Sequence, residues 1–432
     1  MPHDPTLERL LNFLQRSPTP WHAVANMSKR LEQAGFRRLD ETQSWQLAPG
    51  ERVYVTRNES SLVALQLPND RLRALRMIGA HTDSPGLRLK PNAAQVSSGW
   101  LQLGVEVYGG ALLAPWFDRD LGVAGRVHLR REDGRLHSVL LNVTRPVAIV
   151  PSLAIHLDRE VNEGRAINPQ TQMVPVLLQG GEQGDIERLL QRWLYEQHNI
   201  EKAAILDFEL ALYDTQPPAR VGVEGELIAS ARLDNLLSCF IGLEALLNGD
   251  GRQGAVLVAN DHEEVGSASA CGAQGPFLGD VLRRVNAQLG EEGEEGFIRL
   301  IQASRLISCD NAHALHPNFT DKHDAGHGPA INGGPVIKVN ANQRYATNSA
   351  TSAMFRDLCR EAGVPVQTFV SRADMACGST IGPITATELG VPTLDVGVAQ
   401  WGMHSIRETA GSQDIEYLTR ALTAFVNRPE LV

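Results

Sequence analysis

The chain has 432 residues, of which 43% are hydrophobic and 21% charged, and its formal net charge is −10. This length exceeds the ~250–300 residues that one hydrophobic core usually serves, so we expect two domains in an ordinary globular protein. The acidic balance argues against a nucleic-acid partner. No window of the sequence reaches the ~18 consecutive apolar residues of a membrane helix, so we expect no membrane partner.

The N-terminal segment and the cysteines predict a cytoplasmic protein. The segment lacks a basic start followed by an apolar core, so we expect no signal peptide. The five cysteines are odd in number, widely spaced and form no C-x-x-C pair. We therefore expect reduced thiols, and none stands beside a histidine and a base that would make it a nucleophile.

The first part of the chain predicts two helices followed by strands. Apolar positions at helical spacing run from 7 to 35 and are interrupted by the run SPTPWH. Strand-like runs follow at 52–57, 61–67 and 72–80. The last of them leads into AHTDSPG, so His81 and Asp83 emerge just beyond a strand. In open α/β sheets, ligands bind at that edge.

The middle of the chain has a different pattern of predicted elements. Between residues 91 and 230, short β-rich runs at 100–108, 122–130 and 138–143 alternate with turn residues, with one helical pattern near 185–198. Helix and strand alternation resumes at 231. We therefore expect an α/β domain formed by residues 1–90 and 231–432, interrupted by a β-rich insert at 91–230.

The run VLVANDHEEVGS combines a strand with two adjacent carboxylates. Its apolar start predicts a buried strand at 255–259, and Glu263 and Glu264 follow closely. Buried carboxylates are costly unless a cation meets them. Adjacent side chains in an extended segment point to opposite sides, so one glutamate could hold a metal while the other faces a reacting water. A solvated loop after a strand is the alternative.

Further ligand candidates also follow strands or begin helices. Asp310 follows a strand at 305–309, and His404 comes after a strand-like run at 391–398. Asp234 begins a helix, where an aspartate is most often an N-cap. With His81 and the paired glutamates, these residues fit a two-zinc site in which one carboxylate bridges the ions.

The charges of such a site balance. Two Zn²⁺ ions, three carboxylates and one hydroxide are neutral together, so a dry pocket tolerates them. Asp83 could accept the other imidazole N–H of His81 and fix its tautomer. The histidine-rich run DNAHALHPNFTDKHDAGH is a local alternative, but no cysteine completes a structural zinc site there.

Several long motifs occur in order over nearly the whole chain: AHTDSPG, RLDN, NDHEEVGS, CDNAHALHPN, GGPVIKVNANQRYATN, ACGSTIGP and MHSIRE, with IVPSLAIHLDR in the insert. Together they resemble the aspartyl aminopeptidase family of two-zinc metallopeptidases. The resemblance implies a zinc-peptidase α/β sandwich domain, an inserted dimerisation domain, and dodecamers built from dimers.

The resemblance also implies two Zn²⁺ per subunit and a role for each candidate. His81 and Asp310 would hold one zinc, and Glu264 and His404 the other. Asp234 would bridge them, and Glu263 matches the general base.

The family removes N-terminal Asp or Glu from peptides, and three more positions match residues that contact its substrate. Lys338 matches the lysine that binds the acidic side chain, and Tyr345 a substrate-contacting position. His156 matches a histidine that reaches the active site of a neighbouring subunit. An exposed strand lysine and an interface histidine are the alternatives for Lys338 and His156.

A two-zinc aminopeptidase of broad or neutral specificity is the alternative function. A catalytically inactive scaffold is a further alternative, from a different class of protein.

Overall fold

The structure is a computed structural model that describes residues 5–130, 133–180, 185–201 and 204–431. Its contacts define two compact units. Unit 1 contains the chain up to Asp83, then Pro218–Met403, then the chain from Glu408 onward, whereas unit 2 contains Ser84–Pro217 and His404–Arg407. Among the described residues, no helix has the length and apolar character to cross a membrane.

Unit 1 is built around a nine-stranded mixed sheet. In spatial order its strands are β1 (Arg37–Arg38), β2 (Arg52–Arg57), β3 (Ser61–Gln66), β13 (Gly254–Asn260), β4 (Leu75–His81), β14 (Arg305–Cys309), β18 (Thr393–Gly397), β16 (Val336–Val339) and β17 (Gln367–Val370). The four central strands β13, β4, β14 and β18 are parallel. The neighbouring strands β3 and β16 run antiparallel to them. The strands predicted at 52–57, 255–259 and 305–309 are confirmed.

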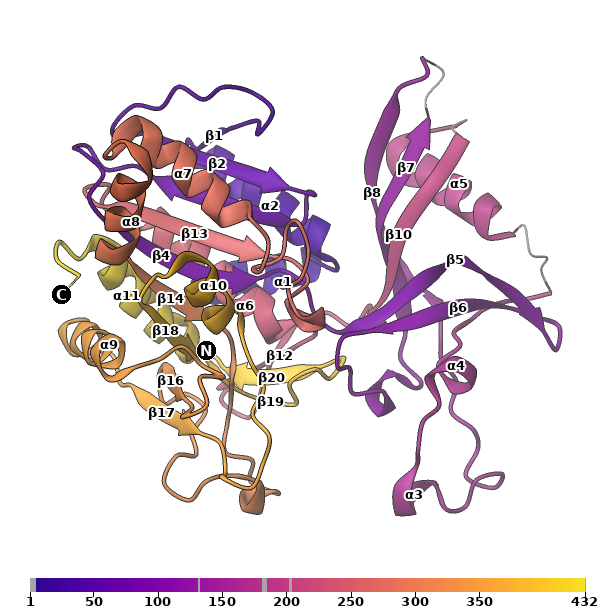
Figure 1. The fold of residues 1–432 in the computed structure, drawn as a ribbon. Coiled ribbons are helices and arrows are strands. Elements are labelled where there is room, and N and C mark those ends of the chain that lie inside the picture. Colours follow the sequence, from indigo (N-terminus) through magenta and orange to yellow (C-terminus); the bar gives the residue numbers. More distant parts are fainter. Residues whose placement is uncertain (1–4, 131–132, 181–184, 202–203, 432) are drawn as a thin grey trace. The chain divides into compact units, whose positions relative to one another are not determined.

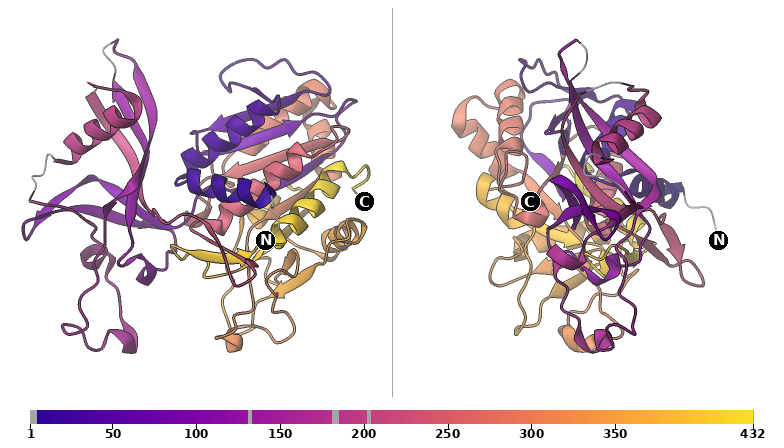
Figure 2. Two further views of the ribbon diagram at one scale, coloured as in Figure 1. Left: turned by 180° about the vertical axis from the view of Figure 1, so that it is seen from behind. Right: turned by 90° about the vertical axis from the view of Figure 1, so that its right-hand side faces the viewer.

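Helices cover both faces of this sheet, which confirms the predicted α/β class (Figures 1 and 2). One face is covered by α1 (Pro5–Arg16), α2 (Pro20–Gln33), α6 (Leu233–Leu247), α9 (Ser349–Glu361) and α11 (Asp414–Asn427). The other face is covered by α7 (Phe277–Leu289), α8 (Gly293–Ala303) and α10 (Ile381–Leu389).

The alternation of side chains along β13 explains why two separate cores form. Ala255, Leu257 and Ala259 pack into the core with α6 and α11. Val256 and Val258 point to the opposite face and pack with α7 and α8. A parallel strand that is buried on both faces is apolar at every position, as this run is.

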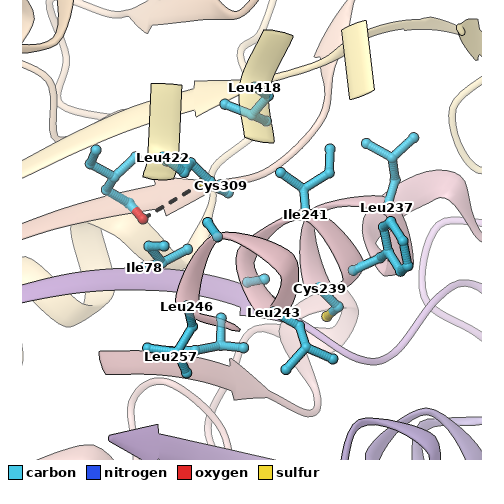
Figure 3. Close-up of a cluster of buried hydrophobic side chains, with 14 of the residues drawn as sticks. Ile78, Leu237, Cys239, Ile241, Leu243, Leu246, Leu257, Cys309, Leu418 and Leu422 are labelled. Atoms are coloured by element: carbon cyan, nitrogen blue, oxygen red, sulfur yellow. Dashed lines mark hydrogen bonds between the residues drawn. The ribbon is translucent and has the colours of Figure 1, made fainter. Parts of the chain in front are cut away.

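The core beneath α6 and α11 is tightly packed (Figure 3). Helix α6 is buried around nearly its whole circumference, as expected for a helix with apolar residues on all sides. Gly242 lets it approach the sheet, because a Cβ there would lie 2.8 Å from Leu257 Cδ1 and 3.0 Å from Ile78 Cγ2. A close backbone approach of this kind leaves no space for a larger residue.

Replacing Leu257 with alanine is expected to lower the free energy of unfolding by about 2–5 kcal/mol, because the side chain is fully buried and its removal leaves a cavity. Urea unfolding followed by circular dichroism measures this loss. Ile298 on α8 is 49% exposed, so Ile298→Ala is a matched control that should cost far less. Equal losses for both variants would contradict the described core.

A five-stranded sheet completes unit 1. Its strands are β11 (Ala219–Val221), β12 (Leu227–Ser230), β20 (Glu408–Gly411), β19 (Ala399–Trp401) and β15 (Ala312–His313). Strand β15 closely follows β14, and β19 closely follows β18. The small sheet therefore continues from the carboxyl ends of the large sheet's central strands.

Unit 2 is β-rich. Its sheet is antiparallel, in the order β8 (Leu136–Ala148), β7 (Leu121–Arg130), β10 (Ala204–Asp214), β5 (Gly86–Ser97), β6 (Trp100–Tyr108) and β9 (Val176–Gln179). Helix α5 (Asp185–His198) buries Leu190, Trp193 and Leu194 in the core of this unit. The short helices are η1 (Ala114–Trp116), α3 (Val161–Gly164) and α4 (Pro169–Gln172). A dimerisation role for the insert stays a prediction.

Candidate metal centre

The carboxyl ends of the parallel strands collect the predicted ligands at one edge of the large sheet. Strand β4 ends at His81, which pairs in register with Asn260 at the end of β13. Glu263 and Glu264 follow β13 in a 3₁₀ turn, η2 (Glu263–Val265), and Asp310 directly follows β14. This is the edge where open α/β sheets bind ligands.

His81, Asp234 and Asp310 form a buried group with ligand atoms within 4.8 Å of one another. The Nε2 atom of His81 lies 3.4 Å from Asp234 Oδ1 and 4.0 Å from Glu263 Oε2. His81 forms a second group with Glu263 and Glu264, which are partly buried. The predicted ligands of unit 1 therefore converge, although they come from distant parts of the chain.

Asp234 lies at a kink in the first turn of α6. Arg232, the residue before this helix, makes no side-chain capping bond. Asp234 has non-helical backbone angles, φ −82° and ψ 106°, and its N–H donates to Glu408 Oε2 at 2.9 Å. Its carboxylate is thereby directed towards His81.

Asp83 organises the pair of glutamates. Its carboxylate oxygens accept the backbone N–H groups of Glu263 and Glu264, each at 3.1 Å. Its Oδ1 lies 3.4 Å from His81 Nδ1, and its backbone oxygen lies 3.1 Å from the same nitrogen. Asp83 therefore lies next to the imidazole nitrogen whose tautomer it is predicted to fix, and its anchoring of the η2 turn was not predicted from the sequence.

The electrostatics of the centre favour a bound cation. Burial raises the pKa of Glu263 to about 7 and the pKa of Asp310 to about 6, and it also raises the pKa of Glu264. Burial by itself lowers the pKa of His81, but hydrogen bonds to Asp234 and Asp83 outweigh it and raise the pKa well above its usual value. Metal ions would relieve this crowding of buried carboxylates. Zinc binds imidazole nitrogen and carboxylate oxygen atoms, so the residues present fit zinc.

The two predicted substrate-binding residues of unit 1 lie beside the centre. Lys338, in β16, is buried, and its Nζ lies 3.7 Å from Asp310 Oδ2 and donates to the Asn311 carbonyl at 3.2 Å. The same ammonium lies 5.1 Å from the centre of the Tyr345 ring. Lys338 is therefore buried beside the Asp310 carboxylate, unlike the exposed strand lysine that was the alternative.

A cavity of about 300 Å³ opens beside Tyr345. Its lining includes the aromatic residues Phe369 and Trp401, together with Arg372 and Lys322. Apolar walls with a few polar groups are typical of a small-ligand pocket.

His404 and His156 belong to unit 2 by their contacts. The chain runs from Trp401, which ends β19, through His404 to Glu408, which begins β20. Because β19 and β20 pair antiparallel in unit 1, both ends of this loop are anchored there. His156 lies in an exposed turn of the insert. The roles of both histidines stay predictions.

A third group of potential ligands lies in the same loop as the glutamates. Asp261, His262 and Cys271 bring ligand atoms within 4.8 Å of one another. His262 Nδ1 lies 2.8 Å from Ser269 Oγ and 3.6 Å from Cys271 Sγ. Cys271 thus lies beside a histidine because the loop folds back on itself, and the expectation that no cysteine is a nucleophile stays a prediction. Residue spacing alone gave no signal of this contact.

The histidine-rich run at 310–327 does not form a compact ligand group. Among the described residues, groups of at least three potential ligands do not include His313, His316, His323 or His327. His323 Nε2 instead accepts the backbone N–H of His316. The local zinc-site alternative therefore finds no support.

Comparison with known proteins identifies the family. The Aminopeptidase I zinc metalloprotease (M18) family matches residues 13–426. The chain belongs to this family. It is an M18 metalloaminopeptidase and therefore a hydrolase, and the resemblance found in its sequence is confirmed.

Relatives of this M18 aminopeptidase match it along its length. A protein of Pseudomonas entomophila, described as a probable M18 family aminopeptidase 2, is 56% identical over 426 residues, which are 98% of each chain. A solved chain in the Ape4 and Nbr1 complex is 38% identical with a TM-score of 0.94, covering 98% of this chain and 85% of that chain. The mApe1 dodecamer of S. cerevesiae is 26% identical with a TM-score of 0.85, covering 97% of this chain and 95% of that chain.

Proposed function

We propose that this protein is a two-zinc aminopeptidase that removes N-terminal Asp or Glu residues from peptides. The observation that carries the proposal is the convergence of His81, Asp234, Asp310 and the paired glutamates at one sheet edge, with a buried lysine 3.7 Å from Asp310. Membership in the M18 family supplies the aminopeptidase chemistry.

Each ligand has a defined place in this proposal. His81 and Asp310 would hold one zinc, Glu264 and His404 would hold the other, and Asp234 would bridge both. The buried group of His81, Asp234 and Asp310 supports the first set. When bound, zinc supplies Lewis-acid chemistry that polarises the scissile carbonyl and activates water.

Glu263 acts as the general base. It takes a proton from the attacking water and passes it to the leaving amine. Burial raises the pKa of Glu263, and a nearby cation would lower it again, so a zinc-loaded site favours the ionised carboxylate that a base needs. Asp83 keeps this base in place, because its carboxylate holds the backbone of both glutamates.

Lys338 provides the acidic specificity. A substrate aspartate is ionised at neutral pH, given a reference pKa of ~3.9. The Lys338 ammonium has three N–H donors, and one of them is committed to the Asn311 carbonyl. The Tyr345 ring is 4% exposed and lies against the same ammonium, so it shields that side of the pocket from water.

Assembly completes the proposal. The insert forms dimers, the dimers form a dodecamer, and His156 stabilises the developing oxyanion in a neighbouring subunit. His156 lies among exposed apolar residues, Leu153, Ile155 and Leu157, and an apolar surface of this kind suits contact with a second copy.

We place the protein in the cytoplasm, in keeping with five cysteines that form no disulfide.

The acidic specificity is tested by comparing kcat/KM for a peptide with N-terminal Asp and for its N-terminal Asn counterpart. The two substrates differ in charge at nearly constant size. Losing a charge-assisted hydrogen bond to Lys338 should cost on the order of 1–3 kcal/mol, so the Asp substrate should be preferred several-fold to more than a hundredfold.

Lys338→Gln should abolish that preference, because the amide cannot supply the charge. Lys29 is an exposed lysine on α2, so Lys29→Gln is the matched control and should keep the preference. Good turnover with equal kcat/KM for both substrates in the parent enzyme would support the broad-specificity aminopeptidase instead.

A further inference from the structure

A buried chain of hydrogen bonds connects the proposed bridging ligand with the proposed specificity lysine. Glu408 Oε2 accepts the Asp234 N–H at 2.9 Å, and Glu408 Oε1 accepts from Gln400 Nε2 at 3.5 Å. Gln400 Oε1 accepts from Asn311 Nδ2 at 2.7 Å, and the Asn311 carbonyl accepts from Lys338 Nζ at 3.2 Å. All of these side chains are buried.

The five-stranded sheet holds this chain of side chains in position. Glu408 begins β20 and pairs with Ser230 in β12, and Gln400 pairs with Ala410 across β19 and β20. Asn311 lies between Asp310 and β15, whose Ala312 pairs with Ala399. The five-stranded sheet therefore fixes the backbone of Glu408 and Gln400, and Asn311 directly precedes one of its strands, whereas Lys338 is held by β16 of the large sheet.

We propose that Glu408 is a positioning residue for the metal centre. It holds the backbone of Asp234 so that the aspartate carboxylate faces the ions, and it anchors Lys338 through Gln400 and Asn311. This inference rests on the proposed function and deepens it, because one residue orients both the bridging ligand and the residue that selects the substrate.

The chemistry of Glu408 suits this role. An ionised carboxylate only accepts hydrogen bonds, so it can serve two donors at once. A glutamine has a single acceptor oxygen and must direct its NH₂ group at one of those donors. Residues that orient a metal ligand in this way typically contribute 10–100-fold to metal affinity, about what we expect Glu408 to contribute.

The test measures zinc affinity by titrating the full-length apoprotein with zinc in a chelating buffer. Glu408→Ala should weaken zinc binding about 10–100-fold, and Glu408→Gln should weaken it by a smaller factor. Glu416, an exposed glutamate on α11, provides the matched control, and Glu416→Ala should bind zinc like the parent. The zinc-dependent rise in Tm should shrink in the same order, because ligand binding stabilises by mass action.

A purely structural role predicts a different pattern. It would lower the Tm of the apoprotein and leave the zinc affinity of the folded protein unchanged, and that outcome overturns the proposal. If Glu408→Ala does not fold, Glu408→Gln carries the test, and binding as tight as in the parent overturns it equally. A parent that binds zinc but removes no acidic residue refutes the proposed specificity, whereas the comparison of zinc affinities still decides the role of Glu408.

Discussion

Replacing Glu263 with glutamine is expected to lower kcat by about 10²–10⁴-fold, which is the usual contribution of a general base. Glutamine has nearly the same shape but cannot accept the proton from the attacking water. The backbone N–H of residue 263 would still donate to Asp83, so the η2 turn should keep its position. Zinc content should therefore stay close to that of the parent, as measured by mass spectrometry of the metal after dialysis.

The adjacent glutamate supplies a sharp contrast. Glu264→Gln removes a proposed zinc ligand, so it should lose metal as well as turnover. Glu295 is exposed on α8, and Glu295→Gln should change neither quantity. If Glu263→Gln kept its activity, or lost zinc as readily as Glu264→Gln, the division of roles between the two glutamates would be wrong.

Replacing Asp234 with alanine is expected to remove zinc and abolish turnover together. A ligand that bridges two ions contributes to the affinity of both, so the loss should exceed the 10–100-fold typical of a residue that only orients a ligand. Zinc content per subunit and the zinc-dependent rise in Tm measure this effect. The same substitution should lower the Tm of the apoprotein far less than the Tm of the zinc-loaded protein, because no metal contributes to the stability of the apoprotein.

A second aspartate near the far end of α6 serves as the control. Asp250 lies just beyond the helix and is exposed, so Asp250→Ala should keep both zinc and activity. An Asp234→Ala variant that was fully loaded and active would contradict the bridge.

Much of the central sheet could be predicted from the sequence, because each of its buried strands is a short, continuous apolar run. The apolar run at 255–259 and the strand ending at Cys309 are continuous buried segments of the right length. The polar residues that follow these strands had to lie at strand ends, so the sequence alone groups His81, Glu263 and Asp310. Strand order was beyond local patterns, since β13 lies between β3 and β4 only through pairing of distant segments.

The contacts that tune the centre were the least predictable. Glu408 lies in the run MHSIRE, yet nothing in that run indicates that its carboxylate meets the Asp234 N–H. Cys271 meets His262 because a loop reverses direction, and Asp83 anchors two backbone groups far along the chain. Each of these contacts depends on tertiary geometry, for which residue spacing carries no signal.

The position of β4 in the sheet has a consequence for how the chain is made. Strand β4 ends at His81, whereas its two neighbours begin only at Gly254 and Arg305. On a ribosome that adds about 5–20 residues per second, β4 waits on the order of ten seconds or more with both edges unpaired. Unpaired apolar strands are sites of aggregation, so we expect a nascent chain paused within the insert to depend on chaperones.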